Sequence, residues 1–359
     1  MKRIPFEEKE MEVLKEYPPA FEGLFPLRIY NRPVSNKENW RLLYHEKAPV
    51  WVPYDIENTF FSPAVIPDSV ARGLVVEAQP FDPDTQAGGA DMYGTDWVYQ
   101  PEQAGSMVRP GAPRIEDMND WKDVITRPDI DAWDWAGCAE ANREYLGGDM
   151  YVVCQLLSGW FERIISLMDF AEAALALIDE DQKDAIHEFL DAVSEDMCKI
   201  IDKVAEYMPE VDGFVIHDDW AGQASPFFSQ ETAMEMIVPH MKKVTDHLHS
   251  KGMSAELHSC GHGESRVEAF IAAGWDAWCP QPMNDTAALY EQYGDQIIVM
   301  MDPGLPPEPT EEQQRQTARE FARRFCKPGK IALPGGENYM NYPAFEEEFY
   351  RATRRIFSE

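Results

Sequence analysis

A histidine and a cysteine two residues apart, His258 and Cys260, have the clearest chemical potential in this sequence. They follow the apolar run from Met253 to Leu257, which is typical of a buried strand. Zn²⁺ accepts imidazole nitrogen and thiolate sulfur together. The plainer alternative is a core histidine bonded to a backbone carbonyl beside a buried thiol. Because two ligands do not make a zinc site, the pair predicts a metal only with a third donor.

Two residues at the ends of later apolar runs are candidates for that donor. Cys279 ends the run from Trp275, which is expected to be the next strand, and neighbouring strands end at the same edge. Glu337 follows the last expected strand and could supply an oxygen ligand. Each has a structural alternative: packing behind Trp278 for Cys279, and a solvated loop carboxylate for Glu337. We predict metal ligation by His258 and Cys260, with Glu337 and Cys279 as candidates for the remaining positions.

A second group of polar residues follows the short apolar run from Gly213 to Ile216. His217, Asp218 and Asp219 could act as proton acceptors, as ligands or as hydrogen-bond partners that orient His258, although aspartate after a strand is also a common turn residue. We take these three as catalytic candidates. Aromatic side chains would suit a flat guest, or would pack the N-terminal segment. The substrate-binding candidates are Gln223, Tyr54, Trp97 and Asn338.

Alternating apolar runs and helical patterns from about residue 150 indicate parallel β/α units. The clearest helix spans Asp184 to Met208 with a period near 3.6 and ends at Pro209. Ser229 is expected to cap a helix that ends near Ser250. The expected strands are 50–54, one within 70–100, 151–157, 213–216, 253–257, 275–279, 297–301 and 331–333.

About eight such units predict a TIM (β/α)₈ barrel, a single domain over residues 1–359 with an N-terminal extension of about residues 1–48. A doubly wound open sheet is the alternative, but no G-x-G-x-x-G or Walker A sequence follows any expected strand. In a barrel, the residues that follow the strands gather at one end, where the chemistry takes place.

The composition restricts the partners. The formal net charge of −32 disfavours nucleic acid and anionic membranes, and leaves a small molecule or a protein with a basic docking face. No apolar run approaches the roughly 20 residues of a membrane-spanning helix. The acidic N-terminus shows no secretory signal, so we expect a cytoplasmic protein. Six widely spaced cysteines indicate reduced thiols.

The segment from Gly213 to Gly263 resembles the uroporphyrinogen decarboxylase superfamily, and within it the zinc- and corrinoid-dependent methyltransferases. The resemblance extends more weakly from about Tyr93 to the C-terminus. It depends on Ile216-His217-Asp218-Asp219-Trp220, Ser229-Gln230-Glu231, Pro239-His240-Met241-Lys242-Lys243 and His258-Ser259-Cys260-Gly261. It implies a TIM barrel with the active site in its mouth, zinc held by His258 and Cys260, and a corrinoid carried by a partner protein.

The chain departs from the family pattern in two places. Coenzyme M methyltransferases of this group have a further zinc-binding cysteine in a P-G-C context, whereas this chain reads Pro334-Gly335-Gly336-Glu337. The arginine-rich signature of the decarboxylase is absent from residues 1–60. We therefore expect a zinc-dependent transfer of a methyl group from a small substrate, such as a methoxylated aromatic compound, to a corrinoid protein. Methylcobalamin-to-thiol transfer, a metal-free decarboxylase and a binding protein without catalysis are the alternatives.

Overall fold

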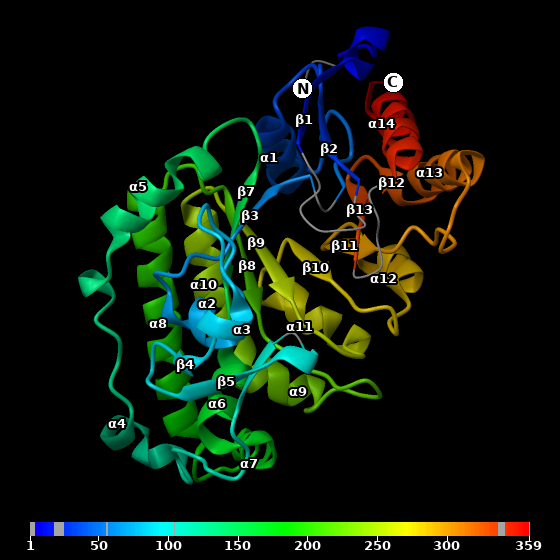
Figure 1. The fold of residues 1–359 in the computed structure, drawn as a ribbon. Coiled ribbons are helices and arrows are strands. Elements are labelled where there is room, and N and C mark those ends of the chain that lie inside the picture. Colours follow the sequence, from blue (N-terminus) through cyan, green and yellow to red (C-terminus); the bar gives the residue numbers. More distant parts are fainter. Residues whose placement is uncertain (1–3, 18–24, 55–56, 104, 337–341, 359) are drawn as a thin grey trace. The chain divides into compact units, whose positions relative to one another are not determined.

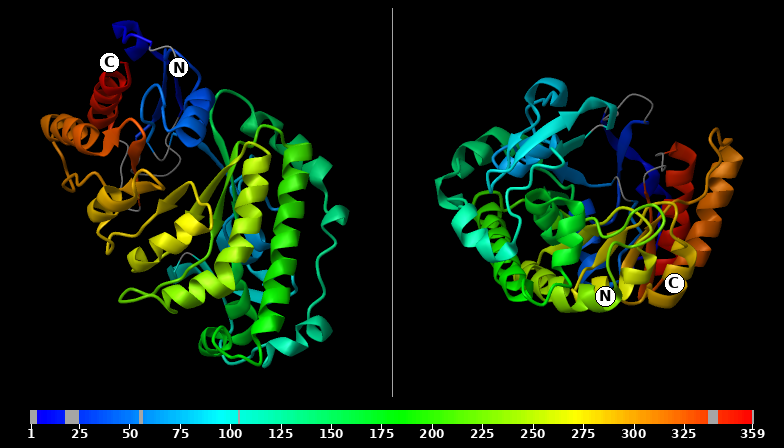
Figure 2. Two further views of the ribbon diagram at one scale, coloured as in Figure 1. Left: turned by 180° about the vertical axis from the view of Figure 1, so that it is seen from behind. Right: turned by 90° about the horizontal axis from the view of Figure 1, so that it is seen from below.

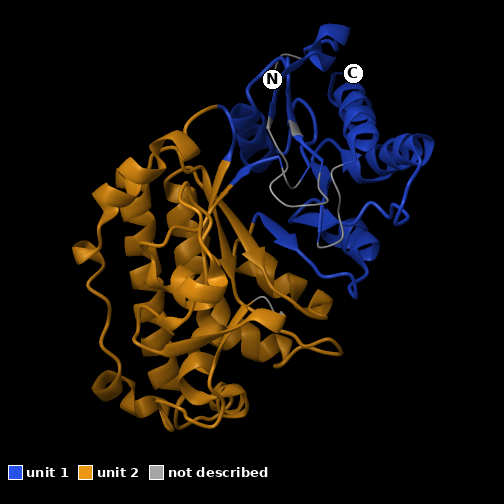
Figure 3. Cartoon of the chain, viewed as in Figure 1, with its two compact units in different colours: residues 1–59, 149–151, 276–359 blue, residues 60–148, 152–275 orange. Residues whose placement is uncertain are grey.

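The computed structural model describes residues 4–17, 25–54, 57–103, 105–336 and 342–358 (Figure 1). The chain divides into two compact units (Figure 3). The first comprises residues 1–59, 149–151 and 276–359, and the second comprises residues 60–148 and 152–275. This division does not test the prediction of a single domain.

The second unit is built on three parallel strands, β7 (Val152–Leu156), β8 (Gly213–His217) and β9 (Ser254–His258). Because side chains alternate along a strand, each strand has two faces. One face is apolar and fully buried, and carries Cys154, Leu156, Phe214, Ile216, Ala255 and Leu257. The opposite face carries Gln155, Val215, His217, Glu256 and His258. The strand register pairs His217 with His258, so these two polar side chains lie next to each other on the opposite face.

Helices follow each of these strands. They are α6 (Trp160–Met168), α7 (Phe170–Ala176), α8 (Lys183–Tyr207), α9 (Gln230–Thr232), α10 (Val238–Ser250) and α11 (Val267–Ala272). Helix α8 confirms the helix expected from Asp184, and α8 and α10 lie side by side (Figure 2). Ser229 caps α9 as expected, because its hydroxyl accepts a hydrogen bond from the Thr232 amide. A π-helical turn, Ala233–Ile237, joins α9 to α10.

A long segment precedes β7 in the second unit. It contains β3 (Thr59–Phe61), α2 (Pro67–Arg72), α3 (Pro83–Gln86), β4 (Gly89–Ala90), β5 (Asp96–Gln100), β6 (Gly105–Val108), α4 (Trp121–Val124) and α5 (Trp135–Leu146). Strand β3 borders β7. The strand expected within 70–100 corresponds to β5, but β5 pairs antiparallel with β4 and β6 and is therefore not one of the parallel strands.

The first unit contains a parallel set, β10 (Ala277–Cys279), β11 (Ile298–Met301) and β13 (Lys330–Pro334), with β12 (Cys326–Lys327) antiparallel to β13. Strands β1 (Val13–Tyr17) and β2 (Leu27–Tyr30) pair antiparallel. The helices of this unit are α1 (Asn36–Glu46), α12 (Thr286–Tyr293), α13 (Glu311–Phe325) and α14 (Pro343–Ser358). A buried ion pair between Glu10 and Arg354 fixes the N-terminal segment to α14.

The strand expected over 50–54 is wrong, because this segment is irregular. The buried Asn39 side chain accepts hydrogen bonds from the amides of Val50 and Trp51 and donates one to the Trp51 carbonyl. Backbone groups that would pair in a sheet are thus satisfied by a side chain from α1. Local periodicity does not reveal this, since the competing partner is 11 residues away.

The expected alternation of parallel strands and helices is confirmed in both units. Closure into a (β/α)₈ barrel is not seen among the strands that the structure describes. Within the same residues, no helix has the length and apolar character needed to cross a membrane.

Candidate metal centre

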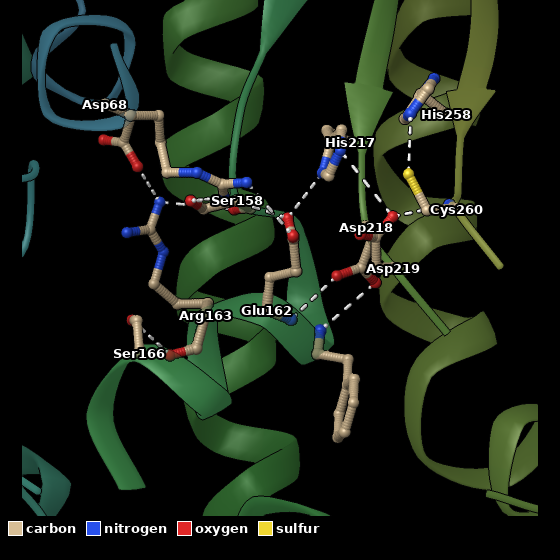
Figure 4. Close-up of polar contacts among 12 residues, drawn as sticks. Asp68, Ser158, Glu162, Arg163, Ser166, His217, Asp218, Asp219, His258 and Cys260 are labelled. Carbon is tan, nitrogen blue, oxygen red and sulfur yellow. Dashed lines mark hydrogen bonds and ion pairs between the residues drawn. The ribbon is translucent and has the colours of Figure 1, made fainter. Parts of the chain in front are cut away.

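Four side chains of the second unit gather where β8 and β9 end (Figure 4). His217 and His258 end the two strands, while Asp219 and Cys260 follow them by two residues each. One possible ligand atom from each residue lies within 4.8 Å of the others. Nε2 of His258 is 3.3 Å from Sγ of Cys260, and Nε2 of His217 is 3.8 Å from Oδ1 of Asp219. Two imidazoles, a thiol and a carboxylate form a donor set that suits zinc.

The parallel register explains why the two histidines meet. His217 and His258 are paired across β8 and β9, and their rings stack with centroids 4.7 Å apart and an interplanar angle of 19°. A shift of one residue in either strand would turn one imidazole to the apolar face. The pairing of two histidines that are 41 residues apart in the chain therefore assembles half of the donor set.

A close backbone approach shapes the loop after β9. The Cys260 amide donates a hydrogen bond to Oδ1 of Asp219 at 2.6 Å. Gly261 has φ +83°, and a Cβ there would lie 2.2 Å from the Ala221 carbonyl oxygen. Only glycine fits this position, since both the left-handed conformation and the contact exclude a side chain. The glycine of the His-x-Cys-Gly sequence thus allows the Cys260 loop to pack against the loop that follows Asp219.

The pKa values of the two stacked histidines are shifted in opposite directions. Burial lowers the pKa of His217, but the charge and hydrogen bond of Glu162, a hydrogen bond with Cys260 and the charge of Asp219 together raise it well above the usual value. Burial and the charge on His217 lower the pKa of His258 to about 4, which keeps it a neutral ligand. Burial also raises the pKa values of Cys260 and Asp219. Zinc must therefore displace the thiol proton on binding.

Asp218 is fully buried and makes contacts different from those of Asp219. Its carboxylate accepts hydrogen bonds from the Phe161 and Glu162 amides at the start of α6, and from Nε1 of Trp220 at 2.7 Å. Burial and the nearby Glu162 charge raise its pKa to about 7. These contacts orient α6 against β8. The predicted catalytic role of Asp218 stays a prediction.

The other predicted site residues lie in different surroundings. Gln223 is exposed in the loop after β8, and Trp97 is buried on β5. Tyr54 is buried in the first unit, where Cys279 ends β10. Glu337 and Asn338 lie outside the described residues. The roles assigned to these residues stay predictions, as do those of His217 and Asp219 in catalysis.

Sequence reasoning missed Glu162 and Arg72. Oε2 of Glu162 lies 2.9 Å from Nδ1 of His217, and Arg72 contacts both carboxylate oxygens of Glu162. An acidic residue in the first turn of the helix that follows a strand end was the available signal. That signal is weak, because acidic residues in first turns are common for helix stability alone.

No protein family model matches the chain, and no curated protein matches it. Among solved structures, a methyltransferase from Methanosarcina mazei is similar with a TM-score of 0.47 and 15% identity, over 71% of this chain and 73% of that chain. A glycoside hydrolase family 10 endo-β-1,4-xylanase from Gloeophyllum trabeum has a TM-score of 0.32 and 12% identity, over 62% and 78%. A D-psicose 3-epimerase has a TM-score of 0.31 and 8% identity, over 63% and 84%. At these values the likenesses assign no activity to the chain.

Proposed function

We propose that this protein is a zinc-dependent methyltransferase that moves a methyl group from a small methylated substrate to a corrinoid carried by a partner protein. The observation that supports it is the gathering of His217, Asp219, His258 and Cys260 within 4.8 Å. We propose these four as the zinc ligands. His217 and Asp219 then occupy the two ligand positions for which the sequence suggested Glu337 and Cys279 as candidates.

The donor set favours a particular chemistry. A methyl group on oxygen or nitrogen resists displacement because the leaving heteroatom departs as a strong base. When bound, zinc would supply Lewis-acid stabilisation of that heteroatom. One thiolate with nitrogen and oxygen donors leaves more positive charge on the ion than a thiolate-rich set would.

The proposed reaction balances without a further cofactor. The carbon–oxygen bond of a methyl ether breaks as a bond forms between that carbon and the Co(I) of the corrinoid, which provides the electron pair. The electron pair of the broken bond remains on the oxygen, which takes a proton from water. The methoxylated aromatic class is proposed from the leaving ability of phenolate, which exceeds that of an alkoxide.

Metal analysis and a transfer assay test this function together. Purified protein is expected to hold about one zinc ion per chain, and to transfer methyl groups from at least one member of a panel of methyl ethers and methylamines to Co(I) corrinoid. A variant with His258→Ala and Cys260→Ala is expected to lose both zinc and transfer. Full activity in metal-free protein would overturn the zinc-dependent mechanism. Turnover of a porphyrinogen without zinc would support the decarboxylase alternative.

A further inference from the structure

We infer that Glu162 and Arg72 are positioning residues that select Nε2 of His217 as the metal-binding atom. This inference rests on the metal centre of the proposed function and adds to it a support outside the ligand set. Glu162 Oε2 lies 2.9 Å from Nδ1 of His217, on the side of the ring away from Asp219 (Figure 4). Nδ1 therefore donates its proton to Glu162, and Nε2 is the nitrogen that binds an ion, once the ion has displaced the Nε2 proton.

Arg72 holds Glu162 in the orientation that this contact requires. Its Nη1 and Nη2 lie 3.3 and 3.4 Å from the two carboxylate oxygens of Glu162, and Nη1 also donates to Oγ of Ser158 at 2.9 Å. The side chains of Arg72 and Glu162 are only 16% and 12% exposed. A carboxylate this poorly solvated needs a paired cation, so Arg72 keeps Glu162 charged beside the imidazole.

Arg72 is in turn held by contacts with the segment from β4 to β6, residues 89–108. The Arg72 guanidinium stacks on the Trp97 ring at 4.8 Å from the ring centroid, and Nε1 of Trp97 donates to Oδ2 of Asp91 at 3.0 Å. Asp91 is also paired with Arg163, the residue after Glu162 on α6. Trp97, which we predicted to bind substrate, thus packs beneath the guanidinium. The contacts form a continuous path from β5 through Arg72 and Glu162 to His217.

Carboxylate partners of metal-bound histidines fix the ring orientation and increase ligand basicity, and their loss commonly lowers metal affinity about 10–100-fold. We expect the same range for Glu162. The effect should depend on this contact and not on the total charge of the protein, so removal of a carboxylate elsewhere should leave the zinc affinity unchanged.

The test uses Glu162→Gln, and zinc affinity is measured by competition with a chromophoric chelator. Because Glu162→Gln leaves Arg72 buried without its partner and could prevent folding, a double variant with Arg72→Gln and Glu162→Gln removes both charges. Glu264→Gln is the matched control, since Glu264 lies 3.4 Å from Nε2 of the partly exposed His262. Both Glu162 variants should bind zinc about 10–100-fold more weakly, and the control should bind like the wild type.

Long-range ¹H–¹⁵N spectra of the zinc-loaded proteins give a second readout that a merely structural role would not change. The wild type should show His217 protonated on Nδ1 and metal-bound through Nε2. In the Glu162 variants, His217 should no longer be held in this single protonation and binding state. Without metal, the double variant and the wild type should unfold at similar urea concentrations.

The outcomes separate this inference from the proposed function. Unchanged zinc affinity and an unchanged His217 tautomer in the folded double variant would overturn the positioning role and leave the function standing. Weaker zinc binding in that variant, with no methyl transfer by the wild type to any Co(I) corrinoid, would support the positioning role and refute the function. Wild-type protein that binds no zinc would overturn both.

Discussion

Nε2 of His258, the last residue of β9, lies 3.3 Å from Sγ of Cys260, which is in the loop after that strand. This separation lets both atoms bind one ion without a backbone movement. Because each donor contributes to a single centre, loss of either should release most of the metal.

The first prediction concerns zinc content. Cys260→Ser is expected to reduce the zinc bound per chain from about one to near none after dialysis, because a hydroxyl is a much poorer zinc ligand than a thiolate. Mass spectrometry of metal per protein gives the measurement. Cys198→Ser is the control, since Cys198 is also a partly buried free thiol but lies on α8 outside the cluster. Equal zinc loss in both variants would refute a specific role for Cys260.

The second prediction concerns Gly261. Gly261→Ala should destabilise the protein by more than about 2 kcal/mol, because it combines a left-handed backbone conformation with a contact between Cβ and the Ala221 carbonyl. Gly252→Ala separates the two effects. Gly252 has φ +72° but nothing within 4 Å of the added Cβ, so it should cost only about 1 kcal/mol. Urea unfolding of the metal-free variants measures both values. Equal losses would show that the contact contributes nothing.

The strand ends and the order of the elements could be predicted from the sequence because the apolar runs are long and regular. The periodicity of α8, for example, appears in every turn from Ile186 to Val204. His258 and Cys260 could likewise be singled out, since both belong to one short segment. Their neighbours His217 and Asp219 were noted as catalytic candidates, but their closeness to Cys260 depends on the β8–β9 register.

The roles of Glu162 and Arg72 could not be predicted for a different reason. Arg72 lies 90 residues before Glu162, and the position of Glu162 in the first turn of a helix after a strand is a signal shared with many structural residues. The irregular 50–54 segment was misassigned because a single buried side chain, Asn39, replaces a strand partner. Contacts of this kind involve one residue from each of two distant segments, and no local pattern reports them.

The third prediction concerns pH-dependent stability through Glu346 in the first unit. Burial raises the pKa of Glu346 from 4.5 to about 8, although Arg32 acts in the opposite direction. Between pH 4.5 and 8 the folded state keeps a proton that the unfolded state releases. The free energy of unfolding contributed by this group is thus fully present below pH 4.5 and is lost as the pH rises toward 8, by at most about 1.4 kcal/mol per pH unit.

Glu346→Gln keeps the shape and removes the ionisation, so it should flatten this slope relative to the wild type. Urea titrations at pH 5, 6, 7 and 8 measure the difference, which should grow in favour of the variant as the pH rises. Glu347→Gln removes a neighbouring carboxylate that is 33% exposed and paired with Arg28, and should not produce this trend. A constant difference between Glu346→Gln and wild type at all four pH values would contradict the prediction.

The last prediction compares two ion pairs between the N-terminal segment and α14. Glu10 accepts hydrogen bonds from Tyr350 at 2.6 Å and from Arg354 at 2.7 and 2.9 Å, and both charged side chains are at most 3% exposed. Removing one member leaves a buried charge without its partner, so Glu10→Gln should lower the free energy of unfolding by about 3–5 kcal/mol. Glu8 pairs with Arg351 at 2.7 Å but is 73% exposed, and Glu8→Gln should cost less than about 1 kcal/mol. Similar losses in urea unfolding of the two variants would show that solvent reaches Glu10 and Arg354 and screens their charges.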